Sequence, residues 1–178
     1  LTEKIQGAEV VAVSDVFEES ARKAAEICGA KVYADSKELI NAENVDAVFI
    51  VSPGFAHVDS LLQAIEAGKR IFCEKPLCTT AEDCLKVVKA EEAAGRHLIQ
   101  LGFMRRYDKG YQQIKEALAT GEYGEPLILH CTHRNPEVGT NYNTPMAVHD
   151  TAIHEIDVLH WLVDDEYESA QVVMPRVT

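Results

Sequence analysis

The sequence has no long apolar run, little glycine or proline, and a deficit of basic residues. Its apolar stretches fall short of the roughly 20 residues that a helix needs to cross a bilayer, so we expect no membrane partner. With 10 glycines and 6 prolines in 178 residues, collagen-like and low-complexity chains are excluded. The 17 Lys and Arg residues against 29 Asp and Glu residues leave a net charge of −12, which argues against nucleic-acid binding.

The five cysteines contain no Cys-x-x-Cys pair. An odd number at irregular spacing suits neither a disulfide framework nor a structural zinc site. The first residues also lack the charged-then-apolar layout of a signal peptide. We therefore expect a cytoplasmic protein with reduced, mostly buried thiols at Cys28, Cys73, Cys78, Cys84 and Cys131.

Strand-like and helix-like segments alternate up to about residue 119. Short apolar, β-branched segments predict strands over residues 8–15, 31–34, 46–52, 70–73 and 97–103. Helical segments between them cover residues 18–28, 36–41, 56–67, 80–94 and 107–119, with Gly29, Gly68 and Gly95 placed to end three of them. This alternation predicts an α/β fold with a doubly wound parallel sheet.

The pattern changes after the turn-rich segment 120–126. We expect a strand over residues 126–134, a polar loop over 135–145, a helix over 149–163 and a last strand over 168–175. A domain boundary near residues 121–125 would leave a first domain of residues 1–121 and a second, mixed α/β domain of residues 122–178.

Asp15 ends the first predicted strand, at the edge where parallel sheets bind their ligands. A carboxylate there can accept both ribose hydroxyls of an adenosine and would repel a 2′-phosphate. The alternative is that Asp15 caps the helix that follows. The glycine-rich loop that usually accompanies such an acid is absent, so we expect the first strand and that loop to lie upstream of residue 1.

Glu74-Lys75-Pro76 follows another buried strand. A lysine at this edge can polarise a substrate oxygen, and Pro76 would fix the turn that aims it. The alternative is an ordinary surface ion pair between Glu74 and Lys75.

The helix from His149 places Asp150, His154, Asp157 and Trp161 on one face. Asp150 and His154, one turn apart, can form a base in which the imidazole takes a proton and the carboxylate orients it. The alternative is a capping aspartate beside a hydrogen-bonded histidine. A metal site would draw on His133, His149, His154 and His160, but the zinc-protease spacing is absent, so we expect no metal.

Four segments together resemble the Gfo/Idh/MocA oxidoreductases, in order along essentially the whole chain. They are EKPLCTTAEDC, GFMRRYD, HCTHRNP and HDTAIHEIDVLHWL. The first marks the broad family, and the others point to its inositol-oxidising branch. The resemblance implies an N-terminal Rossmann domain that binds NAD, followed by an α/β domain whose open sheet carries the substrate site and often forms tetramers.

The resemblance also implies roles for individual residues. His154 would take the hydroxyl proton, with Asp150 and Lys75 positioning it and tuning its charge. Besides Lys75, residues expected along the cofactor are Asp15, Ser52, Pro53, His57 and Glu74. Residues expected to line the polyol pocket are Met104, Arg105, His133, Asn135 and Asp157.

The activity implied is NAD-dependent oxidation of the C2 hydroxyl of myo-inositol to 2-keto-myo-inositol, by a homotetramer. The alternatives are a related dehydrogenase of scyllo-inositol, glucose or another pyranose, and a non-catalytic NAD-sensing member. The strand expected upstream is central in the usual strand order, and the second domain is short. We therefore expect these 178 residues to be part of a longer enzyme, to bind NAD poorly alone and to leave unpaired sheet edges.

Overall fold

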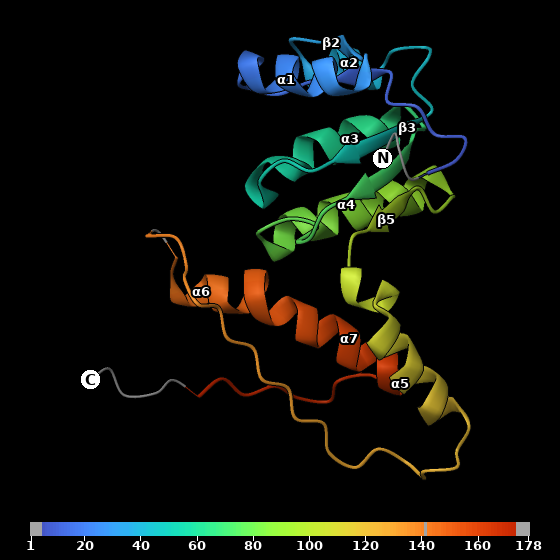
Figure 1. Ribbon diagram of the computed structural model, residues 1–178, viewed down its shortest axis with the longest axis vertical. Coiled ribbons are helices and arrows are strands. Elements are labelled where there is room, and N and C mark those ends of the chain that lie inside the picture. Colours follow the sequence, from blue (N-terminus) through green and yellow to red (C-terminus); the bar gives the residue numbers. More distant parts are fainter. Residues whose placement is uncertain (1–4, 141, 174–178) are drawn as a thin grey trace. The chain divides into compact units, whose positions relative to one another are not determined.

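The computed structural model describes residues 5–140 and 142–173. The chain divides into two compact units, Leu1–Gly102 and Phe103–Thr178 (Figure 1). This division precedes helix α5 (Lys109–Ala119), whereas the boundary expected near residues 121–125 follows that helix. Helix α5 belongs with the second unit because it packs against α7 (Ile153–Val163), where Lys115 Nζ donates a hydrogen bond of 2.6 Å to the carbonyl oxygen of Trp161.

The first unit contains two parallel sheets. One pairs β1 (Ala12–Val13) with β2 (Lys31–Val32), and the other has the order β3 (Ala47–Ile50), β4 (Arg70–Cys73), β5 (Ile99–Leu101). The helices between the strands are α1 (Glu18–Cys28), α2 (Ser36–Ile40), α3 (His57–Glu66) and α4 (Ala81–Ala94). Parallel strands alternating with helices confirm the predicted Rossmann-type α/β fold.

Local sequence signals define several helix ends as predicted. Thr80 is the N-cap of α4, and its hydroxyl accepts a hydrogen bond of 3.1 Å from the backbone N–H of Asp83. Gly95 ends the same helix at φ 69°, a left-handed conformation that glycine adopts without a steric cost. The short predicted strand over residues 70–73 is β4.

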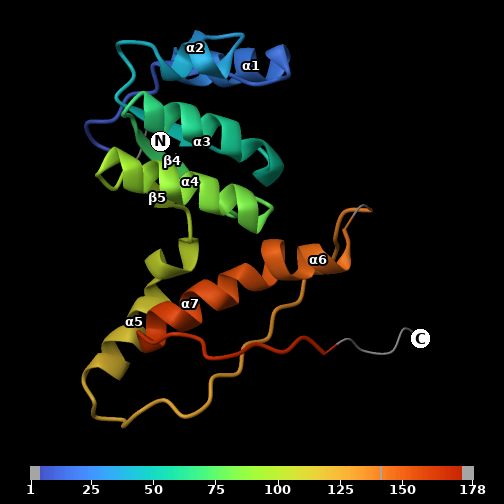
Figure 2. The same ribbon diagram turned by 180° about the vertical axis from the view of Figure 1, so that it is seen from behind.

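The core of the first unit lies where α3 and α4 cover one face of the β3-β4-β5 sheet (Figure 2). Leu61 and Val87 from the helices are fully buried with Ile71 and Cys73 from β4. On the other face, the ring of Phe49 stacks on that of Phe72 at 5.3 Å between centroids and stays half exposed.

The strand predicted over residues 8–15 is much shorter than expected. Only Ala12–Val13 pairs, with β2, and within the described residues β1 makes no ladder with β3. The length of a strand depends on the partner strand to which it is hydrogen-bonded. Because β2 is the partner of β1 and has two residues, β1 is equally short. In the described part of the chain, β1 pairs only with β2 and β3 only with β4, so one edge of each strand is unpaired.

The second unit is mostly helical in its described part. It begins with the 3-10 turn η2 (Met104–Tyr107) and α5, and continues after a long loop with α6 (Thr144–Met146), the π-helical segment η3 (Ala147–Ala152) and α7. The helix predicted over residues 149–163 is thus present, but its first turn is π-helical, so Asp150 does not follow the 3.6-residue period of α7.

Two predicted strands are wrong. Residues 126–134 and 168–173 are irregular, and the rest of the second segment, residues 174 and 175, lies outside the described residues. Leu127 is 91% exposed and Val173 is 79% exposed. A segment with alternating apolar and β-branched residues forms a strand only when a partner strand pairs with it. Neither segment has such a partner in the described part of the chain, so both stay irregular.

Among the described residues, the structure has no helix both long and apolar enough to cross a bilayer.

Candidate functional site

The turns that follow β3 and β4 lie at the same edge of the sheet, because adjacent parallel strands end side by side. Ser52 and Pro53 follow β3 and are exposed, whereas Pro76 in the turn after β4 is buried. The ring of His57 joins the two turns: Nε2 is 2.6 Å from the carbonyl oxygen of Ser52, and Nδ1 is 2.9 Å from that of Pro76. The structure therefore brings these expected cofactor residues together.

Asp15 lies just after β1 and is exposed. Its Oδ1 accepts a hydrogen bond of 2.8 Å from the backbone N–H of Phe17. The N-cap residue of α1 is Phe17 rather than Asp15, so the capping alternative does not describe this geometry. One carboxylate oxygen organises the turn, and the exposed group stays accessible to a ligand.

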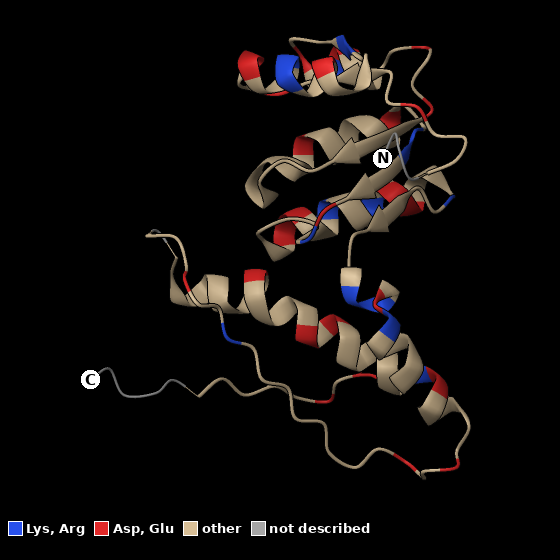
Figure 3. Cartoon of the chain, viewed as in Figure 1, with Lys and Arg blue, Asp and Glu red and all other residues tan. Residues whose placement is uncertain are grey.

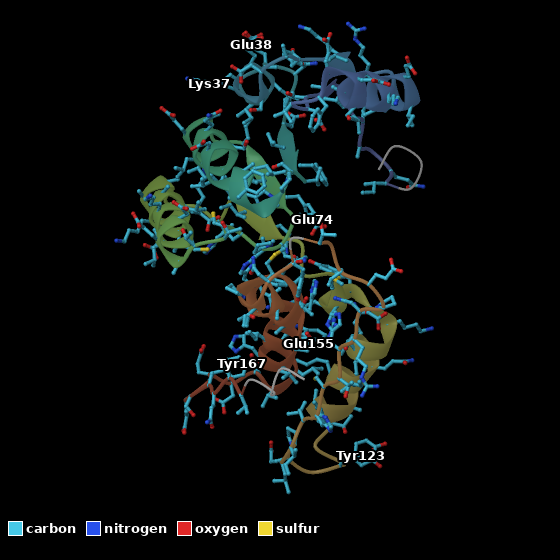
Figure 4. The ribbon with its side chains drawn as sticks, turned by 90° about the vertical axis from the view of Figure 1, so that its left-hand side faces the viewer. Lys37, Glu38, Glu74, Tyr123, Glu155 and Tyr167 are labelled. Carbon is cyan, nitrogen blue, oxygen red and sulfur yellow. The ribbon has the colours of Figure 1, made fainter. Side chains whose placement is uncertain are left out.

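Glu74, which follows β4 (labelled in Figure 4), turns its carboxylate toward its own turn. Its Oε2 accepts a hydrogen bond of 3.1 Å from the backbone N–H of Lys75, and the Lys75–Pro76 peptide bond is cis. Lys75 is half-buried in this turn.

The thiol of Cys73 is buried at the end of β4. Burial, followed by the charges of Cys78 and Glu74, raises the pKa of Cys73 to about 12. The thiol therefore stays protonated.

No group of three or more potential metal ligands comes together in the residues that the structure describes.

In the second unit, Glu155 on α7, which is labelled in Figure 4, organises three of the expected substrate residues. Its carboxylate forms an ion pair with Arg105, and both of its oxygens lie 3.2 Å from Nδ1 of His133. Nε2 of His133 is 3.1 Å from Oδ1 of Asn135. Arg105, His133 and Asn135 are thus held around a carboxylate that the sequence analysis did not single out.

Electrostatics keeps Glu155 ionised. Burial alone would raise the pKa of Glu155, but the hydrogen bond with His133 and the charge of Arg105 together hold it below its ordinary value. The cluster therefore combines a fixed anion with a cation and an imidazole.

An open depression of about 450 Å³, called the cavity below, adjoins this cluster. It is lined by Cys131, His133, Asn135, Val138, Tyr142, Ala147, Thr151, Ala152 and Glu155. The hydroxyl groups of Tyr142 and Thr151 are hydrogen-bonded at 2.7 Å. The volume lies in the range of small-molecule sites, and hydroxyl, amide, imidazole and carboxylate groups are chemically suited to a polyhydroxylated ligand.

Asp157 and Met104 are placed differently from the cavity residues. Asp157 is buried and accepts hydrogen bonds from the guanidinium of Arg106, with Nε 2.9 Å from Oδ2. Met104 is exposed in η2. Neither residue is among those that line the cavity in the described structure.

Asp150 and His154 lie at the start of the long helix, as the spacing predicts. Asp150 is half-buried in η3, and His154 is buried near the beginning of α7. Thr151 and Glu155, the next residue after each, line the cavity. The catalytic roles expected for Asp150 and His154 remain predictions.

The residues that the sequence analysis missed are Arg106, Tyr142, Thr151 and Glu155. Lys and Arg positions gather in the turn before α5, and Asp and Glu positions lie along α7 (Figure 3). Arginines that become partly buried are usually paired with acidic side chains. The adjacent residues Arg105 and Arg106 are therefore the one sequence signal that could have pointed to a second acidic residue such as Glu155. The contact between Tyr142 and Thr151 leaves no comparable signal.

Comparison with known proteins assigns the family. Residues 1–103 match the sequence model of the Gfo/Idh/MocA oxidoreductase family with an NAD-binding Rossmann fold, and residues 111–178 match that of the Gfo/Idh/MocA C-terminal domain. The chain belongs to the Gfo/Idh/MocA oxidoreductase family.

Several relatives in this family are inositol dehydrogenases. The chain is 55% identical over 177 residues to inositol 2-dehydrogenase/D-chiro-inositol 3-dehydrogenase of Halalkalibacterium halodurans, covering 98% of this chain and 51% of the relative. It is 55% identical over 174 residues to inositol 2-dehydrogenase of Pseudomonas syringae, covering 97% and 52%. The chain therefore spans about half the length of these Gfo/Idh/MocA relatives.

A solved structure in the family is similar over the whole chain. It is myo-inositol dehydrogenase from Lactobacillus casei in complex with NAD(H) and myo-inositol, with 48% identity and a TM-score of 0.94. The match covers 100% of this chain and 53% of that one.

Proposed function

We propose that this chain serves in the NAD-dependent oxidation of the C2 hydroxyl of myo-inositol to 2-keto-myo-inositol. The observation that carries the proposal is the similarity, over the whole chain, to a myo-inositol dehydrogenase solved with NAD(H) and myo-inositol. The cavity beside Glu155, with its hydroxyl, amide and imidazole groups, supports a ligand rich in hydroxyls.

The first unit would hold NAD. The exposed Asp15 carboxylate after β1 would accept the hydroxyls of the adenosine ribose, and the turns at Ser52–Pro53 and Glu74–Lys75 would run along the cofactor. These exposed or half-buried groups at the carboxyl ends of parallel strands fit a dinucleotide. The sequence contains no Gly-x-Gly-x-x-Gly loop, so this chain does not itself supply that phosphate cradle. Bound NAD would act as the hydride acceptor.

The second unit would hold the polyol. Arg105, His133 and Asn135 supply donors and acceptors for hydroxyl groups, and Glu155 keeps the first two in place. Met104 would lie beside the carbon ring of the polyol. Asp157 would contribute by holding Arg106.

Proton removal would fall to the helix that begins with η3. His154 would take the proton of the reacting hydroxyl, Asp150 would orient the imidazole and stabilise its cation, and Lys75 would polarise the reacting oxygen. General-base catalysis of this kind contributes about 10²- to 10⁴-fold to a rate. We also propose, from the family resemblance, a cytoplasmic homotetramer, which light scattering on the purified protein would test.

The test uses the complete gene product that carries this chain, whatever its ends. NADH formation is measured with myo-inositol, scyllo-inositol, D-chiro-inositol and glucose. We expect myo-inositol to be preferred, and both Lys75→Met and His154→Gln to lower kcat by about 10²-fold or more. Lys89→Met, at an exposed position on α4, is the matched control and should leave kcat unchanged.

Different outcomes contradict different parts of the proposal. Preference for an aldose or for scyllo-inositol would overturn the substrate. Turnover that survives Lys75→Met and His154→Gln would overturn the residue roles. NAD binding without turnover of any polyol would favour a non-catalytic, NAD-sensing protein.

A further inference from the structure

His57 is a fully buried histidine at the first position of α3, with 0% of its surface exposed. A residue without exposed surface does not touch a bound cofactor or substrate. Its ring instead lies among main-chain atoms of the two turns that carry the candidate cofactor and catalytic residues. A buried imidazole is costly unless both nitrogens find partners, so these contacts account for its presence in the core.

Each ring nitrogen faces a different turn. Nε2 lies 2.6 Å from the carbonyl oxygen of Ser52, in the turn after β3. Nδ1 lies 2.9 Å from the carbonyl oxygen of Pro76 and 3.2 Å from that of Leu77, directly after Lys75. Carbonyl oxygens only accept, so each contact is a hydrogen bond only when the ring nitrogen that makes it carries a proton, and a neutral ring donates to one turn at a time. Whichever nitrogen carries the proton, the ring lies between the two functional turns and contacts both.

A second contact between the same turns supports this arrangement. A Cβ added to Gly54 would lie 3.0 Å from Cγ and 3.1 Å from Cδ of Pro76. The turn after β3 therefore packs closely against Pro76, and a methyl group at Gly54 would require Pro76 to shift by a few tenths of an ångström. His57, at the start of α3, contacts both turns through its ring.

The neighbouring thiol does not replace these contacts. Cys73 Sγ lies 3.4 Å from Nδ1 of His57, but it also donates to the carbonyl oxygen of Glu74 at 3.3 Å. A thiol is a weak hydrogen-bonding group, so the carbonyl contacts dominate the placement of the ring.

We propose that His57 is a positioning residue that sets Lys75 through the Nδ1 contacts and the Ser52–Pro53 turn through the Nε2 contact. This inference rests on the function proposed above, in which Lys75 acts on the reacting oxygen and the Ser52–Pro53 turn passes NAD. The two contacts have separable consequences: loss of the Nδ1 contacts displaces Lys75 and lowers kcat, whereas loss of the Nε2 contact loosens the cofactor turn and raises KM for NAD.

Two substitutions separate the two sides of the ring. The amide nitrogen of Asn stands near the place of Nδ1, and that of Gln stands near the place of Nε2. In the complete gene product, His57→Gln should lower kcat about tenfold or more and leave KM for NAD nearly unchanged. His57→Asn should raise KM for NAD about tenfold and largely preserve kcat. Equal effects of both variants on kcat and KM would overturn the proposal.

A double-mutant cycle tests whether His57 acts through Lys75. In a Lys75→Met background, His57→Gln should lower kcat no further, because the group it positions is gone. Losses that multiply would indicate a merely structural role and overturn the inference. If the His57 variants do not fold, Gly54→Ala provides a second route, since it pushes Pro76 while keeping His57, and it should also lower kcat.

A labelling experiment on Lys75 needs no substrate. Its result therefore tests the positioning role of His57 independently of the proposed function. The rate at which an amine-specific reagent labels Lys75 is followed by peptide mass analysis, with the exposed Lys89 as internal control. We expect His57→Gln to change the labelling rate of Lys75 and His57→Asn to leave it near that of the wild type. Identical rates in all three proteins would overturn the positioning role, whereas a wild-type protein that oxidises no polyol would overturn only the proposed function.

Discussion

Arg106 holds the buried carboxylate of Asp157 through both of its oxygens, with Nε at 2.9 Å from Oδ2 and the terminal nitrogen in contact with Oδ1. Its neighbour Arg105 pairs with Glu155 instead. Residues two apart on a helix point in different directions, so Glu155 and Asp157 receive their arginines on different sides of α7. Glu155, the partner of Arg105, lines the cavity, whereas the Arg106–Asp157 pair joins η2 to α7 within the second unit.

Removing Arg106 should destabilise the protein. Arg106→Ala leaves the carboxylate of Asp157 buried without its partner, and because the guanidinium is itself partly exposed we expect a loss of about 2 kcal/mol in the free energy of unfolding. Urea denaturation measures the loss. The double variant Arg106→Met with Asp157→Leu removes both charges and should recover most of it; a double variant as unstable as the single one would contradict this account.

Glu155 should make stability depend on acid pH. Burial opposes its charge, but His133 and Arg105 hold the pKa of Glu155 below its ordinary value of 4.5. A lowered folded pKa means that its contribution is complete above about pH 4.5 and is lost as pH falls through the folded value. The difference in unfolding free energy between wild type and Glu155→Gln should therefore shrink below that pH.

Urea denaturation at successive pH values gives this difference directly. Glu137→Gln, at an exposed position in the loop before α6, is the control and should show no such trend. A difference between wild type and Glu155→Gln that stays constant from neutral pH to pH 3 would contradict the ion-paired state of Glu155 (the range follows from the usual carboxyl pKa of about 4).

The N-cap of α4 should be worth about 1 kcal/mol. Thr80→Ala removes the hydroxyl that accepts the hydrogen bond of the Asp83 N–H, and we expect a loss of about that size in unfolding free energy. Thr80→Ser keeps the hydroxyl and should behave nearly as the wild type. Thermal or urea unfolding of the wild type and the two variants measures this loss. Equal stability of the wild type and Thr80→Ala would contradict a stabilising N-cap at Thr80.

Asp15 should set the preference between NAD and NADP. Asp15→Ala removes the charge that would repel a 2′-phosphate and the acceptor for the ribose hydroxyls, so the ratio of kcat/KM for NAD to that for NADP should fall about tenfold or more. The complete gene product is assayed with both cofactors. Glu18→Gln, a nearby exposed charge change, should leave the ratio unchanged; an unaltered ratio in Asp15→Ala would remove Asp15 from the cofactor site.

Most of the first unit could be predicted from the sequence because its signals are local. Helix α4 has a capping threonine before it and a glycine after it, and β4 is a short apolar segment between turns. The second unit was predicted less well. Residues 126–134 have the composition of a strand, but composition cannot supply the partner strand that makes one.

The candidate site divides in the same way. Spacing along the chain placed Asp150 and His154 together on one helix, and strand ends marked Asp15, Ser52 and Glu74. The partners of Arg105 and Arg106 lie about 50 residues away along the chain, as the separation of 51 between Arg106 and Asp157 shows. No local pattern decides which of two nearby carboxylates each arginine binds.

The amino-acid sequence alone determined the short motifs that resemble the family, the alternation of strands and helices in the first unit, and the capped ends of the helices. Each of these features depends on residues a few positions apart. Tertiary structure alone decided that His57 is enclosed between two turns, that Asp157 pairs with Arg106, and that Glu155 organises the cavity. Those outcomes depend on burial and on which side of a helix faces which neighbour, and both are set only when distant segments pack together.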